Sequence, residues 1–180
     1  MKLKKISKDS FKTSKWSGGT TTELYIYPEN GSYAERKFEV RISSATVDDD
    51  KSVFTRLDGI YRSLMLLDGE MILDINGNKT KLNQYEHIEF SGTDDTKSIG
   101  QATDFNIMSR KKGCTIEKIT LPFEYMADDG LTFIYCRDCA VLVTANGEKI
   151  NAEKGDLIVS DSGLIKAEGD TFVLVAHTSV

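Results

Sequence analysis

The chain has 180 residues, of which 39% are hydrophobic, and its formal net charge is −5. These values suit a globular protein and exclude a disordered chain, and the acidic balance argues against nucleic-acid binding through phosphates. The three cysteines provide no disulfide framework, which fits a reducing compartment, so we expect a cytoplasmic protein.

The N-terminal stretch up to Lys15 is rich in lysine but lacks the apolar core of a secretory signal. No run approaches the roughly 18 apolar residues of a membrane span, so we expect no membrane partner. Residues 16–23 then read Trp-Ser-Gly-Gly-Thr-Thr-Thr-Glu, and the two glycines permit a sharp turn or a close backbone approach. The hydroxyls and Glu23 suit the rim of a polar pocket. Alternatively, the segment is a surface loop that enters a strand at residues 24–27.

From Tyr33 to Val180 the sequence consists mainly of short β-branched or aromatic runs separated by turn residues, which predicts strands. Residues 38–43 alternate cleanly, so Arg41 and Ser43 share one strand face opposite an apolar face. No amphipathic helix longer than about two turns is evident, although residues 48–57 could contain a short one.

The chain also carries a weak internal repeat. Asn76-Gly77 and Asn146-Gly147 are both signals for type I′ hairpin turns, and they lie 70 positions apart. Each is followed by an acidic turn and an apolar run, at residues 86–88 and 156–158. This order is typical of a cupin-type barrel, and two copies predict an all-β, bicupin-like (RmlC-like) double β-barrel or jelly roll. The alternative is that the offset is a coincidence among common hairpins.

The sequence offers no set of metal ligands. The usual cupin metal site requires a His-x-His pair, but the only two histidines are His87 and His177. Cys136 and Cys139 form a Cys-x-x-Cys pair, but neither a second pair nor a βαβ pattern accompanies it. We therefore expect no metal and no cofactor.

Four motifs, in order, resemble those of the HutD/Ves family. The similar stretches are residues 16–23, 38–47, 54–69 and 104–110, the last reading Asp-Phe-Asn-Ile-Met-Ser-Arg. Where the family has a strand tryptophan and an Asp-Arg pair, this chain has Val40 and Tyr61-Arg62, which makes it more similar to the Ves-like branch.

The resemblance implies one HutD/Ves-like bicupin domain over residues 1–180, with cupin-like modules at residues 16–112 and 113–180. Members of the family lie in or near histidine-utilisation operons or are stress-related, and their biochemical activity is unsettled. The family name suggests a role in sensing or limiting histidine breakdown through binding of formylglutamate. The second module lacks the arginine and threonine features, so we expect it to be mainly structural.

The first module supplies a candidate pocket for an anionic metabolite. If the polar face of the strand at residues 38–43 points into a barrel, Arg41 offers a planar fork suited to a carboxylate. The alternative is that Arg41 pairs with a structural carboxylate such as Glu23 or Glu39. The expected ligand-binding residues are Trp16, Thr20, Thr22, Glu23, Arg41, Ser43, Tyr61, Arg62, Asn106 and Met108.

Three functions remain open at this point. The favoured one is a non-catalytic protein that binds a small carboxylic acid and regulates histidine utilisation or a stress response. The second is a metal-independent cupin-type enzyme, an isomerase or hydrolase, with Glu23 as acid or base. The third is a structural interaction protein whose polar motifs serve the fold or the edge of a homodimer.

Overall fold

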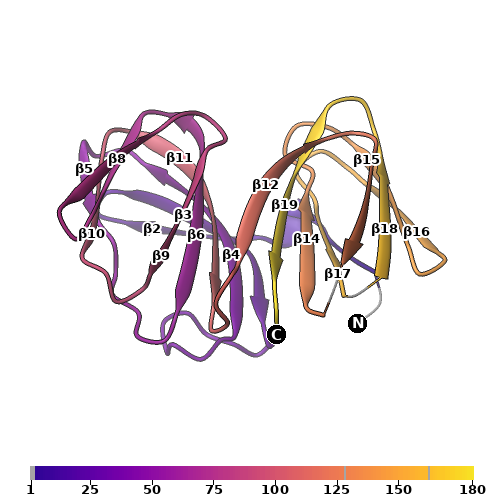
Figure 1. Cartoon of the computed structure of the whole chain (residues 1–180), viewed down its shortest axis with the longest axis horizontal. Helices are drawn as coiled ribbons and strands as arrows, with labels where there is room; N and C mark the ends of the chain where they lie inside the picture. The colour runs from indigo at the N-terminus through magenta and orange to yellow at the C-terminus, as the bar shows by residue number, and fades with distance from the viewer. Residues whose placement is uncertain (1–2, 128, 162) are drawn as a thin grey trace. The chain divides into compact units, whose positions relative to one another are not determined.

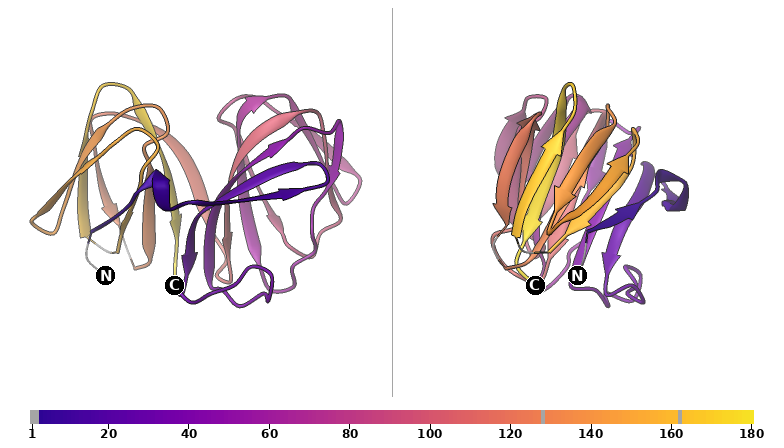
Figure 2. Two further views of the ribbon diagram at one scale, coloured as in Figure 1. Left: turned by 180° about the vertical axis from the view of Figure 1, so that it is seen from behind. Right: turned by 90° about the vertical axis from the view of Figure 1, so that its right-hand side faces the viewer.

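The computed structural model describes residues 3–127, 129–161 and 163–180, which are mostly β-strand (Figure 1). The strands form four antiparallel sheets, none of them closed within these residues. One short 3₁₀-helix, η1 (Lys8–Ser10), is the indigo coil in Figure 2. The prediction of an all-β protein is therefore confirmed. The possible helix at residues 48–57 is wrong, because that segment contains strand β5 (Lys51–Val53).

The chain divides into two compact units. The first is Lys12–Cys114, and the second joins the described residues up to Phe11 to Thr115–Val180. Strand β1 (Lys4–Ile6) belongs to the second unit because it pairs with β17 (Leu157–Ser160). This long-range pairing is not visible in the sequence. Among the described residues, no helix is long and apolar enough to cross a membrane.

The Lys12–Cys114 unit contains a six-stranded and a four-stranded sheet. In spatial order, the six-stranded sheet consists of β2 (Lys12–Trp16), β3 (Gly19–Tyr27), β4 (Val40–Val47), β11 (Ala102–Ser109), β6 (Tyr61–Gly69) and β9 (His87–Ser91). The four-stranded sheet consists of β5, β10 (Thr96–Ile99), β7 (Met71–Ile75) and β8 (Asn78–Leu82).

The second unit contains a five-stranded and a four-stranded sheet. The five-stranded sheet consists of β1, β17, β14 (Leu131–Tyr135), β19 (Phe172–Thr178) and β12 (Thr115–Thr120). The four-stranded sheet consists of β13 (Phe123–Ala127), β18 (Gly163–Glu168), β15 (Val141–Ala145) and β16 (Glu148–Ala152).

The internal repeat is confirmed by the strand order. The order β4-β11-β6-β9 in the first unit matches β12-β19-β14-β17 in the second, and β5-β10-β7-β8 matches β13-β18-β15-β16. The two predicted hairpins occupy equivalent places. Asn76 and Asn146 adopt φ values of 53° and 51°, and the following glycines also have positive φ, as a type I′ turn requires.

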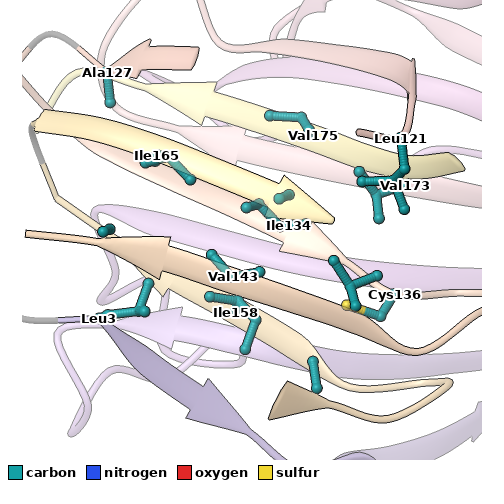
Figure 3. Close-up of a cluster of buried hydrophobic side chains, with 14 residues drawn as sticks. Leu3, Leu121, Ala127, Ile134, Cys136, Val143, Ile158, Ile165, Val173 and Val175 are labelled. Atoms are coloured by element: carbon teal, nitrogen blue, oxygen red, sulfur yellow. The ribbon is translucent and has the colours of Figure 1, made fainter. Parts of the chain in front are cut away.

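The interior of the second unit is aliphatic. Ile134, Val143, Ile158, Val173 and Val175 belong to one cluster in which each is at most 5% exposed (Figure 3). Burial of such side chains contributes roughly 1.5–3 kcal/mol each to stability, so this cluster is the main core of the unit.

The first unit includes smaller apolar clusters among its described residues. One includes Leu64, Leu66 and Leu73, and another includes Phe38 and Met108. The six-stranded sheet, which supplies Leu64, Leu66 and Met108 to these clusters, also buries charged side chains.

Candidate functional site

Five polar side chains of the six-stranded sheet are buried on one of its faces. Arg41 and Ser43 occupy alternate positions of β4, and Asp104 and Asn106 occupy alternate positions of β11. In the register of these strands, Ser43 lies opposite Asn106. Arg62 comes from the neighbouring strand β6, and none of the five is more than 5% exposed. Since strand side chains alternate between the two faces of a sheet, this spacing gathers all five on one side.

These five side chains border a cavity of about 330 Å³. A cavity of this size lies at the lower end of the range of about 300–1,000 Å³ for small-molecule pockets. Its wall is more polar than that of most such pockets, because more than half of its residues carry a charged, amide or hydroxyl group. The remaining wall residues are Ser14, Trp16, Thr21, Tyr33, Ala45, Val47, Ser52, Val53, Phe54, Thr55 and Met108.

Arg41 is held in place by three contacts. Its Nε donates to Glu23 Oε2 at 2.7 Å, and one terminal nitrogen donates to Ser43 Oγ at 3.2 Å. Its guanidinium also lies 4.2 Å from the centre of the Tyr33 ring. The pairing of Arg41 with a structural carboxylate is therefore confirmed, with Glu23 as the partner. Arg41 borders the cavity nonetheless.

Arg62 contrasts with Arg41 because no hydrogen-bond acceptor among the described residues contacts it. Its Nε is buried without a partner, and its guanidinium lies 4.8 Å from the Phe54 ring centre and 5.0 Å from that of Phe90. Burial lowers the pKa of Arg62 to about 10, which leaves the side chain charged at neutral pH. A buried charge without a hydrogen-bond acceptor is costly, so Arg62 is the cavity residue best suited to contact an anionic group.

The cavity wall also carries unpartnered acceptors. Asp104 is 2% exposed, and its Oδ1 has no hydrogen-bond partner in the described structure. Burial raises the pKa of Asp104 to about 7. The charge of Arg62, the Ala45 backbone N–H and the charge of Arg41 each lower this pKa but do not outweigh the burial. Asn106 Oδ1 is buried and unpartnered as well. The wall therefore combines positive charge with one carboxyl group that gains a proton easily.

Six of the ten predicted ligand-binding residues border the cavity. They are Trp16, Arg41, Ser43, Arg62, Asn106 and Met108. Glu23 does not border it but binds Arg41. Thr20 and Thr22 lie on the face of β3 opposite Thr21, which does border the cavity, and the Thr22 hydroxyl pairs with another threonine. Tyr61 precedes Arg62 on β6 and by alternation faces the other side of the sheet.

The sequence-based prediction missed several wall residues. Asp104 was detectable, because it alternates with Asn106 along one strand and must share its face. The correct register of the β2–β3 hairpin would have identified Thr21 as a wall residue. Tyr33 and Phe54 lie outside the strands, in connecting segments, so no periodicity points to them.

The donor groups of the cavity do not fit a metal ion. A metal ion requires three or four converging N, S or O ligands, whereas this wall offers one carboxyl group, with an amide and hydroxyls, beside two guanidiniums that repel a cation. Among the described residues, no group of three or more His, Cys, Asp or Glu side chains is placed to hold one. His87 is exposed on β9, and the His177 Nδ1 lies 3.0 Å from the Thr132 hydroxyl in the second unit.

The Cys-x-x-Cys pair shows no sign of redox activity. Both cysteines are free thiols, and Cys136 is fully buried. Burial raises the pKa of the Cys136 thiol to about 12, which disfavours the reactive thiolate. The Cys139 thiol contacts the Phe172 carbonyl oxygen at 3.5 Å.

Comparison with known proteins gives one family and a fold. The HutD family model matches residues 8–175. A conserved protein of unknown function from Pseudomonas aeruginosa PAO1 superposes with a TM-score of 0.86 at 18% identity, covering 100% of both chains. HutD from Pseudomonas fluorescens SBW25 superposes with a TM-score of 0.76 at 18% identity, covering 98% of this chain and 100% of that one.

A cupin 2 conserved barrel domain protein from Leptotrichia buccalis superposes with a TM-score of 0.59 at 13% identity, covering 98% and 96% of the two chains. A search among curated proteins gives no match. At these identities the structural likeness establishes a cupin-like fold and no more.

Proposed function

The chain belongs to the HutD family, and we propose that it is a non-catalytic protein that binds a small carboxylic acid in the cavity of its first unit. Arg62 carries this proposal, because its buried guanidinium faces the cavity without a hydrogen-bond partner among the described residues. A carboxylate matches the planar fork of a guanidinium and would supply both the missing acceptor and the missing negative charge.

The wider setting of this proposal follows from the family. Its name connects it with histidine utilisation, so formylglutamate is the proposed ligand, and regulation of histidine breakdown or of a stress response is the proposed role. Formate is a second probe, because the HutD structure from Pseudomonas fluorescens is described as a formate condition. The three free thiols support a reducing, cytoplasmic location.

The equivalent strand orders of the two units support a finer reading of the fold. Each unit repeats the same eight-strand arrangement in two antiparallel sheets, which fits a pair of cupin-like modules. We therefore propose a bicupin arrangement in which only the first module carries the ligand site.

Trp16 provides a direct test, because it is the single tryptophan of the chain and borders the cavity. Formylglutamate, formate, glutamate, urocanate and histidine are titrated while its fluorescence is recorded. A saturable change with one acid, absent in Arg62→Met, supports the proposal. Methionine keeps most of the apolar contact of the arginine stem, and Arg56→Met, at an exposed position, is the matched control. The proposal fails if no acid binds, or if Arg62→Met binds as well as the unmodified protein.

A specific observation favours a second function, a metal-independent acid–base enzyme. Such an enzyme needs a carboxyl group in the cavity with a raised pKa and a nearby donor. Asp104 and Arg62 meet this requirement, whereas the carboxylate of Glu23 is engaged by Arg41. Incubation of each acid in D₂O discriminates the two functions. Deuterium incorporation at carbon that is lost in Asp104→Asn would favour the enzyme.

A further inference from the structure

The four charged groups at the cavity differ in how they are compensated. Arg41 and Glu23 form an ion pair with a 2.7 Å separation. Arg62 and Asp104 border the same cavity, and in the described structure Arg62 Nε and Asp104 Oδ1 are buried without a hydrogen-bond partner. Each of them is at most 5% exposed, so solvent screens neither charge well.

An anion at Arg62 would change this balance. The charged groups that face Asp104 are Arg62 on β6 and Arg41 on β4, the latter already paired with Glu23 of β3. With an ionised Asp104, one carboxylate of a bound ligand would bring a third negative charge to the two positive ones. An uncompensated buried charge is destabilising by several kcal/mol. A neutral Asp104 restores the balance.

We propose that Asp104 takes up one proton from solvent when an anion binds, and that this residue sets the pH range in which the cavity accepts carboxylates. The inference rests on the proposed function of the same cavity. Asp104 Oδ1 has no partner in the described structure, so a proton placed there creates an O–H donor. This donor can bind one ligand oxygen while Arg62 binds the other, and the O–H bond to the proton from solvent is the only covalent bond that forms in the site.

The protonation equilibria fit this coupling. Burial raises the pKa of Asp104 to about 7, so the proton is available near neutral pH. The pKa of Arg62, lowered by burial to about 10, keeps that side chain charged across the same range. A small carboxylic acid with an ordinary pKa of about 4 stays anionic throughout. Only Asp104 among these groups changes its charge.

The test measures the dissociation constant of formate and of formylglutamate from Trp16 fluorescence between about pH 5.5 and about pH 8.5, which brackets the pKa of Asp104. The dissociation constant should be constant at the acid end and rise about tenfold per pH unit at the basic end. Asp104→Asn should bind with a flat profile, because the amide keeps a hydrogen-bond donor and carries no charge. Asp58→Asn, at an exposed turn, should keep the slope of the unmodified protein.

A second measurement does not depend on the folding of a variant. Calorimetric titration of the unmodified protein in two buffers of different ionisation enthalpy gives the number of protons taken up. Uptake approaching one proton per bound acid at the basic end supports the inference. Binding without proton uptake, or a pH slope that survives in Asp104→Asn, overturns the inference and leaves the proposed function intact. Absence of acid binding at every pH overturns both.

Discussion

The two units share a strand order but differ in the side chains that occupy equivalent inward positions. In the first unit, Asn106 of β11 lies opposite Leu64 of β6. In the second unit, Val175 of β19 lies opposite Ile134 of β14. Ile134 is 70 positions after Leu64, so Val175 takes the place that Asn106 has in the first unit. The same arrangement of strands thus surrounds a polar cavity in one unit and an aliphatic core in the other.

This difference teaches that the fold does not determine the site. Asp104 lies two residues before Asn106 on β11. The residue that occupies the place of Asp104 on β19 is Val173, which is fully buried in the aliphatic cluster. Arg62 has Thr132 as its counterpart, and the Thr132 hydroxyl binds His177. A handful of inward positions therefore separates a candidate binding module from a structural one.

Exchanging the inward residue between the units should give the largest effect. Val173→Asp places a carboxyl group in an aliphatic core and should destabilise the protein by about 3–5 kcal/mol or more. Asp104→Val removes a buried carboxyl group with one unpartnered oxygen and should destabilise the protein far less. Chemical denaturation of both variants checks the contrast. Equal destabilisation by the two changes would contradict a functional origin for the polar cavity.

Removal of the buried Arg62 guanidinium should give the next largest effect, and this effect should fall on ligand binding rather than on stability. Arg62→Met should weaken carboxylate binding by about 2–5 kcal/mol, which is roughly 30- to several-thousand-fold. Thr132→Val, the equivalent change in the second unit, should leave binding unchanged and lower stability by about 1 kcal/mol through the lost hydrogen bond. Calorimetric titration and thermal unfolding of the two variants separate these effects. Loss of binding in Thr132→Val would break the assignment of the site to the first unit.

Asp104, in the polar interior of the first unit, should make the free energy of unfolding change with pH by a few kcal/mol. The pKa of Asp104 is raised to about 7 in the folded protein, from about 3.9 in an unfolded chain. The folded protein then binds this proton more tightly, so its contribution is fully present below about pH 4 and is lost as the pH rises to about 7. Relative to Asp104→Asn, the unmodified protein should lose on the order of a few kcal/mol over this range and nothing further above it. Urea unfolding at a series of pH values measures the difference, and parallel profiles would refute it.

The smallest expected effect concerns the paired arginine. Glu23→Gln removes the carboxylate that competes for Arg41 and so should tighten carboxylate binding several-fold, by about 1 kcal/mol. The Trp16 fluorescence titration measures this change. Weaker binding in Glu23→Gln would instead mean that Glu23 orients Arg41 for the ligand.

Strand periodicity predicted part of the cavity from the sequence. Arg41 and Ser43 lie two residues apart, so their shared face follows from alternation alone. Whether that face points inward depends on which strands flank it, and no local pattern reveals those neighbours. Asn106 followed from a family motif, and Asp104 in the same motif could have been included by the same alternation.

The wrong or missing predictions concern residues whose positions depend on strand register or on the path of a connecting segment. Thr20 and Thr22 were expected at the rim, but the β2–β3 hairpin places Thr21 toward the cavity, and a shift of one residue reverses every side chain of a strand. Tyr33 and Phe54 reach the cavity from connecting segments without regular structure. Their positions depend on packing that the sequence does not display.

A crystal structure of the protein grown with formylglutamate tests the central claim most directly. The account predicts one carboxylate against the Arg62 guanidinium, with donor–acceptor distances of about 2.7–2.9 Å, and one of its oxygens within hydrogen-bond reach of Asp104. A carboxylate bound anywhere else, in the second unit above all, would contradict the claim that the buried arginine exists to bind an anion.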